Sequence, residues 1–380
     1  MRYYFFSFIY VLFLSCQKEI PSEISEKKEV TLVYMVADND LSSYAIKDIN
    51  EMESAFIPNG KDKFLIYIDT YASSGLPSHP VLLELVPDKT DLIASKIIYS
   101  YPEQNSANEK VFTNILNDAF SYYEEGSITK GLILWSHGNA WFPKNYHLSF
   151  DNSNLVKSFG KDQSPQEDTM EIIELAKAIE PYHFEYLLLD ACFMASIEVL
   201  FELRNSTKFF IASPTEILAN GFPYHLIMPY LTDNLNLEKV VQTYYNYYQS
   251  QSNIQTSASI VLINSYFLDD LSNLYKKIFI NSNNKSISIN HLQQYTRNNI
   301  NLLFDLKQLL LQNEIYVSEI EKLWKNICVL EKHSPNFINL SLSNCNGIST
   351  YLFNSNTLLN DYYKSLSWHK ASSISLYSYK

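Results

Sequence analysis

Two apolar segments of the sequence each end close to a residue that can take part in nucleophilic catalysis. They read GLILW-SHGN (131–139) and YLLL-DAC (186–192), which places His137 after the first segment and Cys192 after the second. The thiolate is the reactive form of cysteine, and a nearby imidazole lowers the pKa of the thiol or removes its proton. A single His or Cys is usually structural, but this pair at the ends of two apolar segments predicts a Cys-His catalytic dyad.

The residues beside this pair suggest how a reaction could be assisted. Cys192 precedes a predicted helix, whose N-terminal dipole would favour the thiolate. Gly138 has no side chain, so a substrate carbonyl group could approach the backbone closely there. The N–H groups of Gly138 and Cys192 could then bind the negative charge that develops on the carbonyl oxygen. We therefore expect these two residues to form an oxyanion hole.

The chain around both segments alternates between predicted strands and helices. Strands are expected at 30–37, 64–71, 81–85, 131–135, 186–189 and 209–212, and helices at 42–56, 105–123, 171–179 and 196–203. The expected strands are largely apolar, which is typical of a mainly parallel sheet covered by helices on both faces. One helix separates the strands that precede His137 and Cys192, so the carboxyl ends of these strands can be neighbours.

Helical segments dominate after about residue 230. They cover residues 237–251, 266–278 and 315–330, and two more strands are expected at 259–263 and 347–353. The predicted fold class is therefore α/β, with a mainly parallel sheet sandwiched by helices and a C-terminal helical annex. Residues 30–235 form the predicted core, and residues 236–380 are expected to complete the same domain.

Composition and charge exclude several classes of protein. The 380 residues include 41 acidic and 29 basic ones, and the net charge of −12 argues against a nucleic-acid partner. A hydrophobic content of 46% excludes global disorder, and four Cys are too few for a disulfide-dense scaffold. The sequence has no Gly-x-Ser-x-Gly, His-Glu-x-x-His or Gly-x-Gly-x-x-Gly motif. These absences argue against a serine hydrolase, a zinc peptidase and a dinucleotide-binding enzyme, and we expect a monomer that requires no cofactor.

The first residues are predicted to be a targeting segment. A basic residue precedes an uncharged run from residue 3 to 14, and Cys16 lies two residues beyond it. Twelve apolar residues are too few to cross a hydrocarbon core of about 30 Å, so the run fits a signal peptide of residues 1–15. The sequence FLSC (13–16) resembles a bacterial lipobox, so Cys16 would become the lipidated start of a tether at 16–29. We expect export and lipid anchoring to the cell envelope, at the outer membrane or cell surface; the alternative is a plain secretory signal.

Longer stretches of the sequence resemble the clostripain family of cysteine peptidases. The resemblance is carried by TLVYMVADNDLSSYAIKDINEME (31–53), LILWSHGNAW (132–141), LLLDACFMASIEVL (187–200) and IASPTEILANGFPY (211–224), and more weakly by 347–353 and 362–370. It implies a caspase-like fold and an endopeptidase that cleaves protein or peptide substrates after Arg or Lys. It also implies that His137 is the general base or acid and that Cys192 is the nucleophile.

The resemblance further implies which residues receive the substrate. Asp190 would face the pocket for the basic side chain, because a buried carboxylate can hold a guanidinium through two hydrogen bonds; the alternative is that Asp190 caps the helix after Cys192. Family members with firm basic specificity often have a second acid in the next loop. We expect Ser213 and Asn220 to line the pocket there, although Asn220 stands where an acid is sought and Glu216 is the only acid of the loop.

A polar stretch at 144–169 lies between the two strands that carry the dyad. In relatives, cleavage in this interval activates the chain, and here it contains Lys144, Lys157 and Lys161. A loop that joins these strands must pass near the site, and its polarity gives it little to hold it in place. We expect self-cleavage after Lys157 or Lys161, with Lys157 preferred because an acid follows Lys161; the alternative is a solvated surface loop.

Two other groups of residues allow more than one reading, and no metal site is assigned to them. Asp38, Asn39 and Asp40 could bind calcium, on which some clostripain relatives depend, or they could cap the next helix. Cys328 and Cys345 could form a disulfide in an exported protein, or they could remain reduced in the core.

The alternative to a peptidase is a non-catalytic surface lipoprotein that keeps the fold to bind peptides or glycans. Retention of both His137 and Cys192 argues against this alternative.

Overall fold

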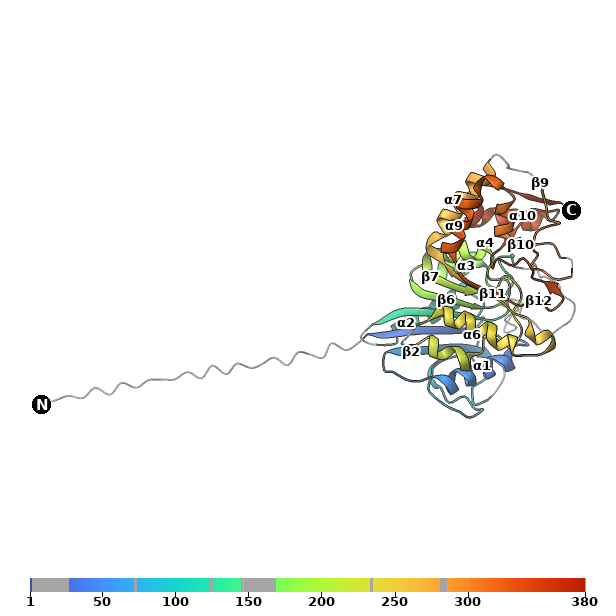
Figure 1. Cartoon of the computed structure of the whole chain (residues 1–380). Coiled ribbons are helices and arrows are strands. Elements are labelled where there is room, and N and C mark those ends of the chain that lie inside the picture. Colours follow the sequence, from blue (N-terminus) through green and yellow to red (C-terminus); the bar gives the residue numbers. More distant parts are fainter. Residues whose placement is uncertain are drawn as a thin grey trace.

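The computed structural model describes residues 27–379 together with Met1, apart from 72–73, 124–125, 145, 147–168, 233–234, 281–285 and 299. Its centre is a nine-stranded sheet with the strand order β11-β8-β7-β6-β5-β1-β2-β3-β4 (Figure 1). The strands are β1 (Lys28–Ala37), β2 (Asp62–Thr70), β3 (Val81–Glu84), β4 (Lys96–Ser100), β5 (Ser127–Trp135), β6 (Phe184–Asp190), β7 (Thr207–Ala212), β8 (Ser259–Asn264) and β11 (Cys328–His333).

The five central strands of this sheet are parallel. They are β2, β1, β5, β6 and β7, and each pairs with its neighbours in the same direction. Two antiparallel strands flank them on either side, β3 and β4 at one edge and β8 and β11 at the other. The prediction of a mainly parallel sheet is confirmed.

Burial on both faces explains why the central strands are so apolar. In β1 every residue from Val30 to Ala37 is buried, and in β6 every residue from Tyr186 to Asp190 is buried. A parallel strand needs a crossover that lays a helix on the sheet, so neither face of such a strand meets water. The hydrophobic runs in the sequence therefore mark the centre of the sheet.

Two layers of helices cover the sheet. Helices α1 (Ser42–Ala55), α5 (Tyr224–Ile227) and α6 (Leu237–Gln249) pack on one another along one face, and α2 (Glu109–Ser121), α3 (Ile172–Ile179) and α4 (Ile197–Leu203) form the layer on the other. In Figure 1, α3 and α4 lie beside each other, on the side of the view away from α1. The sheet is thus sandwiched by helices, as predicted.

The C-terminal region extends both the sheet and the second helical layer. It contributes β8 and β11 to the central sheet and adds α7 (Leu268–Phe279), α8 (Leu306–Leu311), α9 (Val317–Ile327), α10 (Thr357–Ser365) and α11 (Ser367–Ser372). Its remaining strands form three small two-stranded sheets: β10 (Leu303–Asp305) with β14 (Ser349–Tyr351), β12 (Asn336–Phe337) with β13 (Leu340–Ser341), and β9 (Ser286–Ser288) with β15 (Tyr377–Tyr379).

Two local predictions are wrong. The helix expected at 315–330 ends at Ile327, and the chain continues from Cys328 as the edge strand β11. The edge strand β4, which reads KIIYS, was missed, and its residues are mostly exposed. Throughout the described part of the chain, the helices are all too short or too polar to cross a lipid bilayer.

A buried glutamate joins the C-terminal region to the centre of the molecule. Glu198 on α4 accepts hydrogen bonds from the Thr350 hydroxyl (3.0 Å) and the Tyr351 N–H (2.9 Å) of β14. The N–H of Ser349 bonds in turn to the carbonyl of Ala195 (3.0 Å). Burial raises the pKa of Glu198 to about 7. The segment after Cys192 is therefore held against β14 by both backbone and side-chain bonds.

Candidate active site at the ends of β5 and β6

The two strands that precede the predicted dyad are neighbours. β5 and β6 pair in parallel, and Trp135 is opposite Asp190 at their carboxyl ends. His137 and Cys192 each follow two residues later, on the two loops that leave this edge of the sheet. The expectation that the two strand ends meet is confirmed, and it follows from the crossover through α3.

Gly138 packs directly against the backbone of Cys192. A Cβ atom at position 138 would lie 2.3 Å from both the N and the O of Cys192 and 2.8 Å from the carbonyl carbon of Ala191. No real Cβ tolerates such contacts, so any side chain here would push the two loops apart. Close packing between the loops therefore requires glycine at this position, which is a different reason from the access to substrate that we expected.

Cys192 is fully buried, and the backbone of Ile217 covers its sulfur. The Ile217 N–H donates to Sγ at 3.1 Å, and the thiol lies 3.7 Å from the Ile217 carbonyl oxygen. Two backbone bonds hold the same segments together: Phe193 N–H to Thr215 O (2.8 Å) and Ala195 N–H to Ser213 O (2.9 Å). In this conformation the sulfur is closed off from solvent.

The helix after Cys192 begins later than predicted. α4 starts at Ile197, and its N-cap is Ser196, whose hydroxyl accepts from the Val199 N–H. Phe193 has a φ of 61°, a left-handed conformation that turns the chain away before the helix can start. Because the effect of a helix dipole is confined to its first turn, α4 does not stabilise a Cys192 thiolate in the way we expected.

A carboxylate contacts the predicted catalytic histidine. Asp40 Oδ1 lies 2.7 Å from His137 Nε2; the Asp40 side chain is 57% exposed and the His137 side chain 6%. Asp40 follows β1, which is the neighbour of β5 in the sheet, so both residues leave the same sheet edge. Sequence reasoning missed this pair. The signal that could have revealed it is an acid shortly after β1, the strand that neighbours β5 and therefore the loop of His137.

The side chains of Asn39 and Asp40 both make contacts within the fold. The Asn39 side chain bonds to the Val36 carbonyl and the Leu41 N–H, which closes a turn, and Asp40 contacts the histidine. The N-cap of α1 is Leu41, and no side chain caps it. The prediction of a helix cap at these residues is therefore wrong. Calcium binding stays a prediction.

Asp190 is fully buried, and a second buried acid, Asp48, lies nearby. Its Oδ2 accepts hydrogen bonds from the Tyr224 hydroxyl (3.1 Å) and the Phe222 N–H (3.3 Å). Burial raises the pKa of Tyr224 well above its usual value, and the charges of Asp190 and of Asp48 on α1 add to this rise. Asp48 Oδ2 also accepts from the Trp135 indole (2.7 Å). Asp190 therefore does not cap α4, and sequence reasoning missed Asp48 as a carboxylate near it.

The loop after β7 places its only acid elsewhere. Both oxygens of Glu216 bind the Arg297 guanidinium, at 2.6 and 2.7 Å, and both side chains are buried. Ser213 is buried and lies 3.1 Å from the Thr215 hydroxyl. Asn220 is half-buried. Because Arg297 neutralises Glu216, that carboxylate anchors the segment over Cys192 and is not available to a basic substrate.

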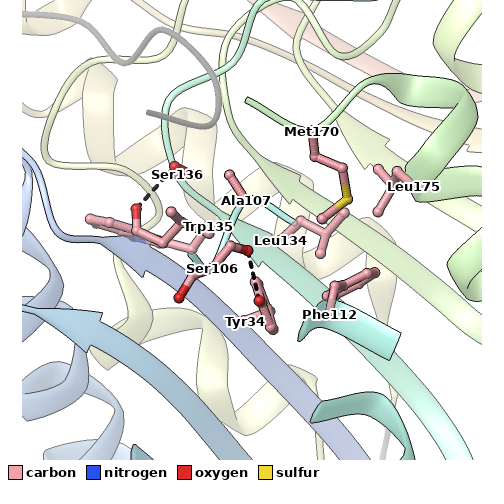
Figure 2. Close-up of a pocket in the computed structure, with 10 residues that line it drawn as sticks. Tyr34, Ser106, Ala107, Phe112, Leu134, Trp135, Ser136, Met170 and Leu175 are labelled. Atoms are coloured by element: carbon pink, nitrogen blue, oxygen red, sulfur yellow. Dashed lines mark hydrogen bonds between the residues drawn. The ribbon is translucent and has the colours of Figure 1, made fainter. Parts of the chain in front are cut away.

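A small cavity lies on the opposite face of the sheet from Asp190. Its volume is about 20 Å³, and its walls are Tyr34, Val36, Ser106, Ala107, Phe112, Leu134, Trp135, Ser136, Met170 and Leu175 (Figure 2). Phe112 on α2 and Leu175 on α3 mark the face to which it belongs. A cavity of this size has room for about one water molecule. It is a packing gap beneath the strand that leads to His137, and it cannot admit a substrate side chain.

Three predicted residues, Cys16, Lys157 and Lys161, lie outside the described residues. Lys144 is described, and its ammonium group pairs with Glu174 on α3 at 3.2 Å.

The two cysteines of the C-terminal region do not form a disulfide. Cys328 and Cys345 are both free thiols, so the reduced alternative describes this structure.

Comparison with known proteins identifies relatives along nearly the whole chain. The sequence model of the clostripain family, peptidase C11, matches residues 33–376. A secreted C11 cysteine protease from Bacteroides thetaiotaomicron, solved in complex with an irreversible peptide inhibitor, has a TM-score of 0.77 and 27% identity; the match covers 91% of this chain and 99% of that one. No curated protein matches the chain.

Two further solved structures have the same fold. An inactive zymogen C11 protease from Parabacteroides distasonis has a TM-score of 0.73 and 26% identity, over 91% of this chain and 98% of that one. Iotapain, a secreted C11 cysteine protease from Bacteroides thetaiotaomicron, has a TM-score of 0.72 over 91% of this chain and 99% of that one; at 20% identity it supports the fold alone.

Proposed function

Because this chain belongs to the clostripain family of cysteine peptidases, we propose that it is an endopeptidase in which Cys192 is the nucleophile and His137 the general base and acid. The observation that carries this proposal is the pairing of Trp135 with Asp190, which sets the loops of His137 and Cys192 side by side. The tight contact of Gly138 with the Cys192 backbone supports it. A non-catalytic binding protein is not favoured by the matches to cysteine proteases.

The reaction that we propose follows from the chemistry of these two side chains. His137 accepts the proton of the Cys192 thiol, and the sulfur attacks the carbonyl carbon of the substrate. The C–N bond breaks as the imidazolium returns the proton to the leaving amine. Water then hydrolyses the thioester with His137 again as base. The N–H groups of Gly138 and Cys192 would stabilise the oxyanion in both steps.

Asp40 is proposed as a positioning residue for His137. A carboxylate 2.7 Å from Nε2 fixes the orientation of the ring and leaves Nδ1 as the nitrogen that exchanges a proton with the thiol. It also stabilises the imidazolium that forms when the thiol loses its proton. The exposure of Asp40 weakens this electrostatic contribution, because water screens the charge.

Substrate specificity for Arg or Lys is proposed to come from two buried acids. Asp190 would bind the basic side chain, and Asp48 would supply the second carboxylate that the loop after β7 lacks. Both carboxylates act on Tyr224, which supports their placement around one polar pocket. A cationic side chain that enters would offset the cost of burying two negative charges.

Activation by self-cleavage is proposed because the nucleophile is covered. The contacts between Cys192 and Ile217 close the site, and the Glu216–Arg297 pair anchors the covering segment. Cleavage after Lys157 or Lys161 would release the connection between β5 and α3 and allow the loops at this sheet edge to shift. A relative described as an inactive zymogen supports this reading. Lys144 is a poorer candidate, since its side chain pairs with α3.

Incubation of wild type beside Cys192→Ala tests self-cleavage. We expect only the wild type to be cut at Lys157 or Lys161, with peptidase activity rising as the cut form accumulates. Full activity of an uncut wild-type chain would refute the activation step and leave the dyad untouched.

Export and lipid anchoring are proposed from the N-terminal sequence. Relatives described as secreted C11 proteases support export, and the lipobox-like segment before Cys16 suggests the anchor. Fatty-acid labelling of the expressed protein should be lost in Cys16→Ser, together with membrane association. Unchanged labelling in that variant would contradict the anchor.

Covalent labelling tests the dyad itself. After activation, an acyloxymethyl ketone that carries a short peptide ending in Lys should modify wild type and leave Cys192→Ala unlabelled. Cys328→Ser provides the matched control, because it removes a different thiol and should be labelled like wild type. Equal labelling of Cys192→Ala and wild type would show that another residue is the nucleophile.

A further inference from the structure

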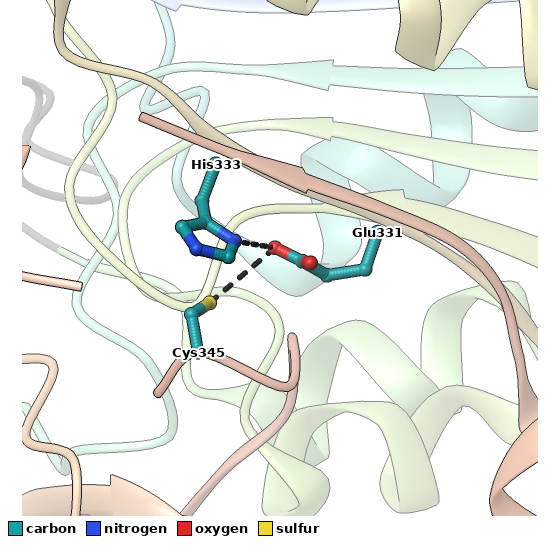
Figure 3. Close-up of side chains that lie close together, drawn as sticks. All are labelled: Glu331, His333 and Cys345. Carbon is teal, nitrogen blue, oxygen red and sulfur yellow. Dashed lines mark hydrogen bonds and ion pairs between the residues drawn. The ribbon is translucent and has the colours of Figure 1, made fainter. Parts of the chain in front are cut away.

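We propose that Glu331, His333 and Cys345 form a binding site for a divalent transition-metal ion, and that the ion is zinc. One donor atom from each side chain lies within 4.8 Å of the other two, and Figure 3 shows the three side chains converging on one point. Carboxylate oxygen, imidazole nitrogen and thiolate sulfur are the donors that zinc takes in proteins. The site is separate from the dyad, and the inference does not depend on the proposed function.

The fold brings these donors together from two segments. Glu331 and His333 are two residues apart on the edge strand β11, so their side chains leave the same face. Cys345 comes from the connection between β13 and β14, and its side chain is buried. Sequence reasoning did not find the site, because Cys345 lies twelve positions after His333 and this spacing matches no common zinc motif.

The distances are close to those of a tetrahedral zinc site. Cys345 Sγ is 3.4 Å from Glu331 Oε1, and zinc–sulfur and zinc–oxygen bonds of usual length at a tetrahedral angle would place these atoms about 3.5 Å apart. His333 Nδ1 is 2.7 Å from the same oxygen. That distance is a hydrogen bond, and it would have to lengthen by about 0.6 Å when an ion replaces the proton.

The groups around the sulfur also suit a thiolate ligand. The Tyr295 hydroxyl is 3.5 Å from Cys345 Sγ, and the Ser259 hydroxyl is 3.8 Å from it. Tyr295 is itself fixed by Asp305, at 2.5 Å. Groups that orient the ligands in this way are typical of zinc sites. Three protein ligands leave the fourth position to water, the arrangement of an open zinc site.

The charges of the cluster favour a cation. A divalent ion would balance the charges of one carboxylate and one thiolate once the Cys345 thiol has lost its proton. The soft sulfur and the imidazole select zinc over calcium or magnesium, which prefer oxygen ligands.

A bound ion would connect β11 to the segment that supports the Cys192 loop. Cys345 is followed by Gly347, where a Cβ would lie 2.9 Å from Val261 of β8, and then by Ser349, which bonds to Ala195. The ion would therefore hold the C-terminal region on the edge of the sheet. We expect zinc to raise the melting temperature by about 3–5 °C when it is in 100-fold excess over its Kd.

Cobalt spectroscopy on the full-length Cys192→Ala protein tests the site, because that background removes the thiol of the dyad as a competing ligand. Titration with Co²⁺ should produce a near-ultraviolet thiolate-to-cobalt charge-transfer band and intense visible bands of a tetrahedral ion. Addition of Zn²⁺ should abolish both. Cys345→Ser in this background should lose the charge-transfer band, and the matched Cys328→Ser variant should keep it.

His333→Gln provides a second variant that does not disturb the core. Its side chain is 27% exposed on an edge strand, so this protein should fold, and we expect zinc affinity to fall about 100-fold or more. The absence of a charge-transfer band in folded Cys192→Ala protein would overturn the proposal. A charge-transfer band that survives Cys345→Ser would also overturn it. The same holds if the zinc affinity and the melting temperature are unchanged in His333→Gln.

Discussion

Two buried thiols in this protein have opposite surroundings. Cys192 receives a backbone N–H from Ile217 at 3.1 Å, and its loop packs against that of His137. Cys345 has the carboxylate of Glu331 3.4 Å from its sulfur. A donor beside a sulfur favours the thiolate, whereas a carboxylate there disfavours it unless a cation is bound. The first environment suits a nucleophile, and the second suits a metal ligand.

The carboxylates near Cys192 contact proton-carrying groups on other side chains. Asp40 contacts the imidazole of His137, and Asp190 contacts the hydroxyl of Tyr224. Each carboxylate therefore acts through a second group that carries a proton. In the C-terminal cluster Glu331 binds both the imidazole of His333 and the thiol of Cys345. The position of the acids, more than burial, separates the two thiols.

The largest effect should come from removing one thiol and sparing the other. Cys192→Ala should reduce kcat/KM for peptide hydrolysis by several powers of ten, since no other group can form the acyl-enzyme. Cys345→Ser, tested at a temperature where it remains folded, should stay within a few-fold of wild type. Steady-state kinetics with a Lys peptide measure both, and circular dichroism confirms folding. Comparable losses of kcat/KM in the two variants would contradict the proposed difference between the two thiols.

A smaller loss is expected from Asp190 and Asp48, the acids of the proposed substrate pocket. Asp190→Asn should lower kcat/KM for Arg and Lys peptides by about 100-fold, and Asp48→Asn by about 10-fold, because each removes a charge-assisted bond to the substrate cation. Uncharged substrates should lose much less. Kinetics with matched peptides that differ only in the residue before the scissile bond measure this. Equal losses for basic and neutral peptides would assign both acids to folding and not to specificity.

The acid beside His137 should have a more modest effect. Asp40→Ala should lower kcat about 10-fold, and Asp40→Asn less, because an amide can still accept a hydrogen bond from the ring. KM for a Lys peptide should stay within a few-fold of wild type, because Asp40 contacts the imidazole and is not proposed to bind substrate. An unchanged kcat in Asp40→Ala, with only a loss of stability, would make Asp40 structural.

The weakest expected effect on catalysis concerns Glu198, which links the Cys192 loop to the segment after Cys345. Its folded pKa of about 7 lies above the ordinary 4.5, so it stabilises the fold fully below pH 4.5 and loses that contribution as pH rises through 7. The contribution amounts to roughly 3 kcal/mol. Glu198→Gln should therefore flatten the fall in unfolding free energy between about pH 4.5 and pH 7, which urea denaturation measures. An unchanged slope would contradict the raised pKa.

The sequence by itself determined the sheet and the meeting of its two reactive strand ends. Apolar runs such as residues 30–37 mark strands buried on both faces, and a crossover through one helix allows β5 and β6 to pair side by side, as they do. His137, Cys192 and the family could thus be predicted before any coordinates, because the evidence lies within short continuous stretches.

Only the tertiary structure decided which distant side chains act on these residues. Asp40 reaches His137 across 97 positions, Arg297 neutralises Glu216 across 81, and Glu331 meets Cys345 across 14. Hydrogen bonds and ion pairs depend on distances of a few ångströms, whereas hydrophobic periodicity survives small shifts of an element. Local patterns therefore predict where strands and helices lie, and the pairing of polar groups between them follows only from the packed fold.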